Sequence, residues 1–132
     1  MFEPSGASFL SPFISTNPAT GQRFAEYPAH DAAELQQRLS LCANAQARQA
    51  ASSTEHRAQQ LVCLAELLEA HRASLALLIS REMGKLLHEA EAEVDKSARL
   101  CREFAALGPG WLTPEYVDMN SAGQAEVHYR PI

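Results

Sequence analysis

The chain has 132 residues, 46% of them hydrophobic and 20% charged, a composition typical of one globular domain and not of a disordered chain. Its 16 acidic residues outnumber its 11 lysines and arginines, which form no cluster, so we expect no nucleic-acid partner. The longest apolar run, residues 75–79, falls well short of the roughly 18 residues that span a bilayer, so we expect no membrane partner. Three cysteines without a C-x-x-C pair indicate free thiols in a reducing cytosol, hence a cytoplasmic location.

The first thirty residues contain a tail and a hairpin. Residues 1–12 are rich in Ser, Pro and Gly without any period, which predicts a flexible tail. Residues 13–16 are β-prone, and the segment 17–21 (Asn-Pro-Ala-Thr-Gly) has turn chemistry, because Pro presets φ and Gly accepts positive φ. Residues 22–27 then alternate. The pattern predicts a hairpin of two short strands.

Three helices are expected next. Asp31 and Glu34 have the spacing of a capping box, which predicts a helix over 31–51. A second helix should run from about 54 to 83 with Ser53 or Thr54 as its N-cap, and at roughly 1.5 Å per residue it would be about 40 Å long. A third helix over 86–107 should stop at the Gly-Pro-Gly of residues 108–110.

The chain closes with one strand. Residues 111–123 show no period, whereas 124–130 alternate with Ala125, Val127 and Tyr129 on one side. A strand without a partner leaves backbone groups unpaired, so this segment either pairs with the N-terminal hairpin or belongs to an interrupted fold. The fold class expected is mainly α with short β elements: an N-terminal hairpin, three helices and one C-terminal strand.

Glu82 stands out in the second helix. It continues an apolar stripe with helical spacing, which predicts that Glu82 faces the core. A buried carboxylate needs a partner, and a cation, backbone N–H groups and water at the helix end are all candidates. By contrast, the acidic run of residues 89–93 is expected to form a solvated face, paired along its own helix with Lys96, Arg99 and Arg102.

Four segments together resemble the N-terminal part of the aldehyde dehydrogenase superfamily. They are residues 16–22 (Thr-Asn-Pro-Ala-Thr-Gly-Gln), 82–85 (Glu-Met-Gly-Lys), 89–94 with its two acid-plus-apolar pairs, and 127–132 (Val-His-Tyr-Arg-Pro-Ile). The resemblance covers about residues 13–132, and within the family it is most similar to bacterial succinate-semialdehyde dehydrogenases. It implies that this chain is a fragment of that α/β fold. Residues 13–123 would flank the NAD(P)-binding domain, and 124–132 would begin the oligomerisation sheet.

The resemblance also implies an activity for the complete enzyme. That activity is hydride transfer from a thiohemiacetal to NAD or NADP, followed by hydrolysis of a thioester. It requires a nucleophilic thiolate, a carboxylate base and an oxyanion donor. In the family the catalytic Cys and Glu and the nucleotide-binding turns come from later residues. We therefore expect no catalytic residue, no bound cofactor and no activity for this chain alone.

A few site residues carry over from the resemblance. Some family members hold a monovalent cation between the acid of the junction and backbone carbonyls before the Asn-Pro turn, which match Glu82 with Ser15 and Thr16; oxygen ligands suit such a hard cation. The alternative is that Glu82 caps nearby backbone N–H groups. Ser97 matches a residue of the substrate tunnel. Leu86 departs from the family, which often has Pro there, so the second and third helices could join with only a kink at Gly84.

Two functional hypotheses follow. In the first, the chain is a piece of an aldehyde dehydrogenase whose partner is the remainder of that fold or a homo-oligomer. In the second, it is a non-catalytic helical interaction module that associates with a full-length relative through its last strand.

Overall fold

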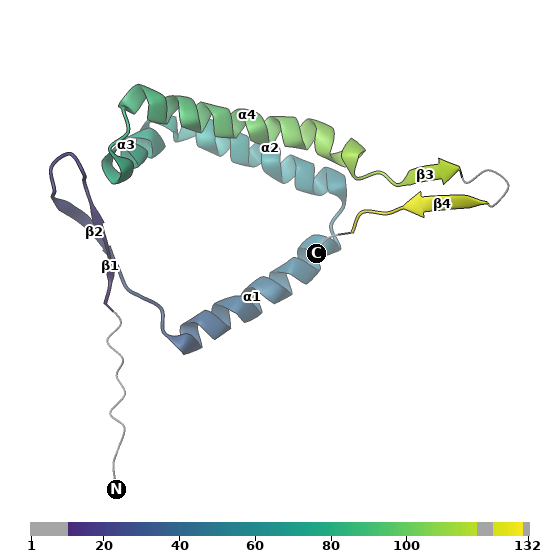
Figure 1. Cartoon of the computed structure of the whole chain (residues 1–132), viewed down its shortest axis with the longest axis horizontal. Helices are drawn as coiled ribbons and strands as arrows, with labels where there is room; N and C mark the ends of the chain where they lie inside the picture. Colours follow the sequence, from purple (N-terminus) through teal and green to yellow (C-terminus); the bar gives the residue numbers. More distant parts are fainter. Residues whose placement is uncertain (1–10, 119–122, 131–132) are drawn as a thin grey trace, which may run out of the picture.

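The computed structural model describes residues 11–118 and 123–130. In chain order it contains β1 (Phe13–Thr16), β2 (Arg23–Tyr27), α1 (Ala32–Ala50), α2 (Thr54–Ala70), α3 (Arg72–Met83), α4 (Leu87–Trp111), β3 (Glu115–Asp118) and β4 (Gln124–Val127) (Figure 1). The expected class, mainly α with short β elements, is confirmed. The predicted tail lies mostly outside the described residues, as do the last two residues of the chain.

The N-terminal hairpin forms as predicted. β1 and β2 pair antiparallel, with Phe13 opposite Tyr27 and a register shift between Ser15 and Thr16. Asn17 organises the turn, because its N–H donates to the Gln22 carbonyl at 2.9 Å and its side-chain Oδ1 accepts from the Ala19 N–H at 2.9 Å. These local bonds explain why so short a turn sequence specifies the hairpin.

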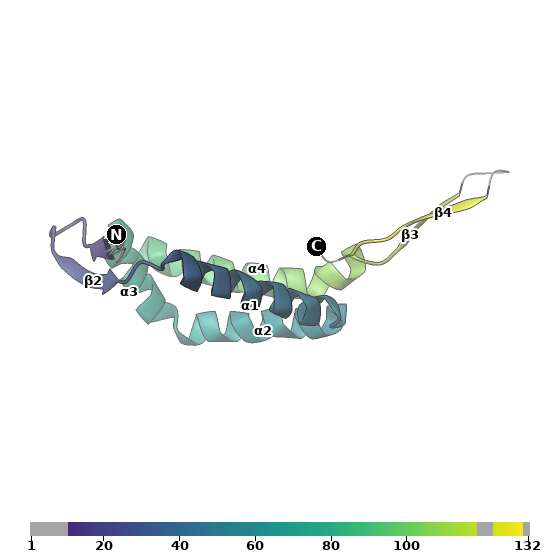
Figure 2. The same ribbon diagram turned by 90° about the horizontal axis from the view of Figure 1, so that it is seen from below.

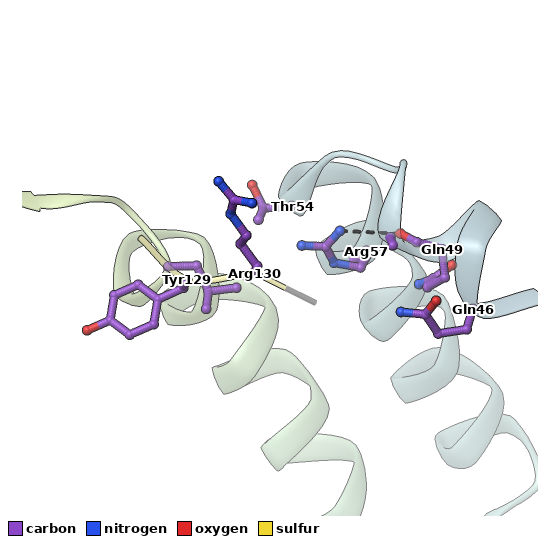
Figure 3. A pocket seen from close by; sticks show the side chains of 8 residues that line it. Gln46, Gln49, Thr54, Arg57, Tyr129 and Arg130 are labelled. Carbon is purple, nitrogen blue, oxygen red and sulfur yellow. Dashed lines mark hydrogen bonds between the residues drawn. The ribbon is translucent and has the colours of Figure 1, made fainter. Parts of the chain in front are cut away.

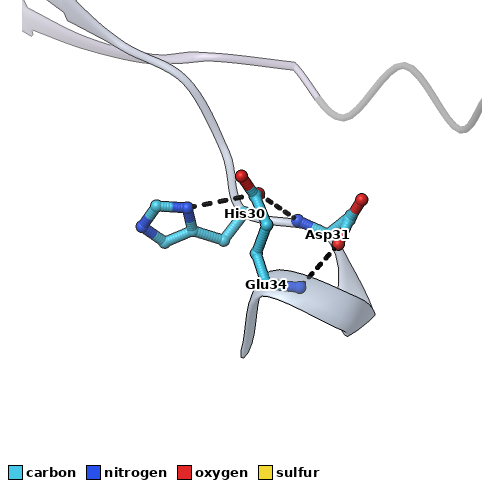
Figure 4. A network of polar contacts seen from close by, with 3 residues as sticks. All are labelled: His30, Asp31 and Glu34. Atoms are coloured by element: carbon cyan, nitrogen blue, oxygen red, sulfur yellow. Dashed lines mark hydrogen bonds and ion pairs between the residues drawn. The ribbon is translucent and has the colours of Figure 1, made fainter. Parts of the chain in front are cut away.

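The capping box at the start of α1 is also confirmed. Asp31 Oδ1 accepts from the Glu34 N–H at 2.8 Å, and Glu34 Oε2 accepts from the Asp31 N–H at 3.0 Å (Figure 4). His30 Nδ1 adds a contact of 3.4 Å to the same carboxylate oxygen. None of the α1 residues is buried, and the helix diverges from α2 and α4 (Figure 1). α1 is therefore well capped but poorly covered.

The core lies along the seam between α4 and the two helices α2 and α3. Figures 1 and 2 show α2 running beside α4 along its length, with α3 against the beginning of α4. Among the described residues the buried hydrophobic side chains are all small: Ala65, Ala76, Ala90, Val94 and Ala98. Small side chains let helix backbones approach closely, but they remove little apolar area from water.

The single long helix predicted over 54–83 is wrong, because the chain bends at His71. His71 has φ −102° and ψ 12°, and its carbonyl accepts both the Leu75 N–H at 3.0 Å and the Ser74 hydroxyl at 2.8 Å. The next residue, Arg72, reaches α4, so the bend directs α3 against that helix. No Gly or Pro marks this position in the sequence.

The end of α4 and the last strand also differ from expectation. α4 continues through the Gly-Pro-Gly segment to Trp111, whose ring packs edge-on against Phe104 with centroids 5.8 Å apart. The predicted lone strand is wrong as well, because β4 pairs antiparallel with β3, a strand that the sequence did not reveal. The β3–β4 ribbon projects from the end of α4 (Figure 2). Within the described ranges, no helix combines the length and apolar character that crossing a membrane requires.

Candidate functional site

The hairpin turn meets the junction between α3 and α4. Gly84 ends α3 with φ +69°, and a Cβ built on it would lie 3.0 Å from Cγ of Pro18. The Arg81 guanidinium lies 4.6 Å above the centre of the Phe24 ring, a cation–π contact between α3 and β2. Two segments separated by more than sixty residues in the chain therefore form one surface, as the family resemblance implied.

Glu82 lies at this junction but does not face the core. Its side chain is exposed, which corrects the prediction from the apolar stripe. The bend at His71 interrupts that stripe, so counting through it gave the wrong face. Ser15 is half-buried and Thr16 exposed on β1, a strand that contacts α3. No group of three or more His, Cys, Asp or Glu side chains is placed to hold a metal among the residues described. A cation held by Glu82 and the Ser15 and Thr16 carbonyls stays a prediction.

The acidic run of α4 forms long-range ion pairs. Lys85 Nζ lies 2.5 Å from Glu93 Oε2, while Arg72 reaches Asp95 at 2.7 Å and Glu91 at 3.2 Å. Glu89 and Glu93 are exposed, as the expected solvated face requires, but Glu91 and Glu93 pair with Arg72 and Lys85 and not with cations of their own helix. Hydrogen bonding and charge attraction from Lys85 lower the pKa of Glu93, and the hydrogen bond from Arg72 chiefly lowers the pKa of Asp95. These pairs attach α3 and the junction to α4.

The lowered pKa of Glu93 predicts a stability difference that depends on pH. Its folded pKa lies below the ordinary 4.5, so its stabilising contribution is present above that value and is lost as the pH falls through the folded pKa. We expect Glu93→Gln to melt at a lower temperature than the wild type at neutral pH, with the difference closing in acid. Melting of the helical circular-dichroism signal across a pH series measures it. Lys85→Met should reproduce the neutral-pH loss, and a difference that persists in acid would contradict an ionic cause.

Ser97 lies at the wall of a small apolar cavity between α2, α3 and α4. Its hydroxyl donates to the Glu93 carbonyl at 2.9 Å, and the cavity has a volume of about 280 Å³. The other lining residues are mostly apolar: Leu68, Leu75, Ile79, Met83, Glu93 and Val94. The position suits a residue that faces a bound molecule, and its role in a substrate tunnel stays a prediction.

A second cavity was not predicted from the sequence. It has a volume of about 340 Å³ and lies where the end of α1, the start of α2 and the residues after β4 converge (Figure 3). Arg57 and Arg130 both line it. The sequence does not indicate that these two arginines line the same cavity, since they are far apart in the chain and match no motif.

Large apolar side chains remain exposed on every helix and strand. On α1, Leu35 and Leu39 are 54% and 55% exposed, and on α4 Phe104 and Trp111 are 52% and 55% exposed. Large apolar side chains exposed in this number are typical of a surface that another polypeptide segment covers. The three thiols are free: Cys42 and Cys63 are exposed and Cys101 is half-buried.

The hairpin, the junction and the helices agree with one known family. The model of the aldehyde dehydrogenase family matches residues 6–132, so the chain belongs to this family. The succinate semialdehyde dehydrogenase Sad of Escherichia coli, which uses NAD(P)+, is 36% identical over 119 residues, covering 90% of this chain and 26% of the relative. A probable NADP+-dependent succinate-semialdehyde dehydrogenase of Synechocystis is also 36% identical, over 88% of this chain and 25% of its own length.

Solved structures show the same relation. The chain superposes on succinate-semialdehyde dehydrogenase from Burkholderia pseudomallei with a TM-score of 0.75 and 28% identity, covering 85% of this chain and 23% of that one. The superposition on Gox0499 has a TM-score of 0.84 and covers 90% of this chain and 26% of that one. Because the identity is only 24%, this similarity supports the fold and nothing further. The chain therefore spans about a quarter of the length of its relatives, consistent with the N-terminal segment that the motifs predicted.

Proposed function

We propose that this chain is the N-terminal segment of a cytoplasmic NAD(P)-dependent aldehyde dehydrogenase and acts only when the rest of that fold covers it. Succinate semialdehyde is the proposed substrate, because two relatives that are each 36% identical to this chain carry that name. The remainder of the fold would bind NAD or NADP and supply the catalytic Cys and Glu, while this chain would bind no cofactor. The three free thiols support a cytoplasmic location.

One observation carries the proposal: a core of alanines beneath a surface of large apolar side chains. The described part buries Ala65, Ala76, Ala90, Val94 and Ala98, whereas every helix and strand exposes at least one large apolar side chain. Burial of apolar area contributes roughly 25 cal/mol per Å², so side chains this exposed stabilise little until another surface covers them. Family membership identifies the remaining aldehyde dehydrogenase fold as that surface.

Fragment complementation tests the proposal. The chain is co-expressed with the part of the E. coli relative that lies beyond the matched quarter, and oxidation of succinate semialdehyde with NAD or NADP is measured. We expect activity from the pair and none from either piece. The relative's own first quarter, expressed separately with the same remainder, is the matched control for the split. Activity with that control and none with this chain would overturn the proposal, as would aldehyde oxidation by this chain alone.

The second hypothesis, a non-catalytic interaction module, is favoured by the projecting β3–β4 ribbon. Its two four-residue strands pair only with each other among the described residues, so their outer edges can accept a further strand. Binding of the chain to an intact relative, without rescue of a relative that lacks its first quarter, would favour this hypothesis over the first.

Expressed alone, the chain is expected to associate with itself or aggregate. The exposed leucines of α1 and the open edges of the ribbon have no cover within the described part, and such surfaces promote association. Size-exclusion chromatography with light scattering should detect species larger than the 14.4 kDa monomer. A monodisperse monomer that melts cooperatively in calorimetry would contradict this expectation.

A further inference from the structure

The cavity that contains Arg57 and Arg130 has an unusual charge. Its described lining residues are Gln46, Gln49, Ala50, Thr54, Arg57, Leu112, Tyr129 and Arg130, and among them are two positive charges and no carboxylate. The whole chain has a formal net charge of −5, which makes this positive wall a local exception. Figure 3 shows both guanidinium groups beside the start of α2.

Arg57 is held in place by backbone carbonyls. Its Nη1 donates to the Ser52 carbonyl at 2.7 Å and is 3.5 Å from the Gln49 carbonyl, so the half-buried side chain is fixed beneath the turn between α1 and α2. A guanidinium has five N–H donors, and these contacts use only one nitrogen. Arg57 therefore has donors left for a further acceptor.

Neither arginine has an acidic partner in the described residues. Three other cations do: Arg72 pairs with Asp95 and Glu91, Lys85 with Glu93, and Arg102 with Glu69. Within residues 11–118 and 123–130, by contrast, no carboxylate lies within ion-pair distance of Arg57 or Arg130. Arg57 is half-buried and Arg130 is exposed, and the charge of Arg57 acts on Glu55 two residues away without an ion pair between them among the described residues. Covering this surface would take both guanidinium groups out of water without a paired counter-charge, which is unfavourable.

We infer that this cavity receives an Asp or Glu side chain from the remainder of the aldehyde dehydrogenase fold. The inference rests on the proposed function and adds the chemistry of one contact. A guanidinium can donate two parallel hydrogen bonds to one carboxylate. The match covers only 26% of the E. coli relative, so the remaining part of such a protein is long enough to supply the acid. The contact would fix the turn between α1 and α2, and the segment after β4, against the covering domain.

The complementing pair described above tests this inference through its dissociation constant at several salt concentrations. We expect Arg130→Gln to weaken association about tenfold and to reduce the salt dependence, because a charge-assisted hydrogen bond is lost. Arg130→Lys should retain the salt dependence and lose less affinity. Arg38→Gln is the matched control, since it removes one positive charge from α1 at an exposed position, where Arg38 makes no ion pair with any described residue.

The outcomes separate the two proposals. If the wild-type chain fails to assemble with the remainder, the proposed function fails. If the wild-type pair assembles and Arg130→Gln behaves like Arg38→Gln, the acid-binding role of the cavity is overturned while the proposed function stands. Arg57→Gln is less informative, because Arg57 also holds the local turn.

Discussion

Gly84→Ala is expected to weaken association with the remainder of the fold roughly 30- to 140-fold. A residue with Cβ at φ +69° costs about 1–2 kcal/mol, and the new Cβ would lie 3.0 Å from Cγ of Pro18, closer than ordinary van der Waals contact. We expect a total of about 2–3 kcal/mol, where each 1.4 kcal/mol is tenfold in affinity. The loss appears in the apparent dissociation constant because only the folded chain binds.

Gly21→Ala is the matched control for Gly84. It has the same φ of +69°, but nothing lies within 4 Å of the position that its Cβ would occupy. The difference between the two variants therefore isolates the contact between the hairpin turn and the helix junction. Equal losses of affinity for both variants would show that Pro18 moves aside without cost.

Ala98→Leu is expected to separate α4 from α2 and to weaken association about tenfold or more. Ala98 is 1% exposed on α4, and the larger side chain has no space in a seam lined by alanines. Overpacking a filled core costs about 1–3 kcal/mol. The dissociation constant of the complementing pair and the helical circular-dichroism signal of the chain both report the change.

Ala92→Leu tests whether position or residue type is responsible. Ala92 lies on the exposed side of the same helix, so the added atoms meet solvent there. We expect near-wild-type association for this variant. If Ala98→Leu behaved in the same way, the helices would be shown to adjust their separation freely, which would contradict the close packing described above.

Features specified by a few neighbouring residues were predictable from the sequence. The capping box needs only Asp31 and Glu34, whose carboxylates accept hydrogen bonds from backbone N–H groups three residues away. In the hairpin turn the Asn17 side chain accepts from the N–H two residues on, while Pro18 presets φ and Gly21 adopts positive φ. Gly84 likewise indicated the end of α3, where it adopts positive φ. In each case the physical cause lies within the segment itself.

Features set by distant contacts were not predictable. The bend at His71 is associated with the ion pair that the next residue, Arg72, makes with α4. The continuation of α4 beyond Pro109 is associated with the packing of Trp111 on Phe104. The partner strand β3 has only four residues and no strong alternation of its own. An apolar stripe counted across an unseen bend also placed Glu82 in the core, although it is exposed.

The candidate site divides in the same way. The sequence identified the junction of residues 82–85, and the structure places that junction against the hairpin turn. The pairing of Lys85 with Glu93 and the cavity shared by Arg57 and Arg130 depend on how helices align, so no local pattern encodes them.

The alanine seam has a consequence for the order in which the protein assembles. Alanine has no side-chain rotamers to lose, so α2 and α4 can close on each other at little cost in side-chain entropy. The leucines and aromatic rings outside the seam keep their rotational freedom at that stage. These side chains can then change rotamer to fit the surface that covers them later. The packing of α2 against α4 therefore forms first, and the rotamers of the exposed apolar side chains are fixed last.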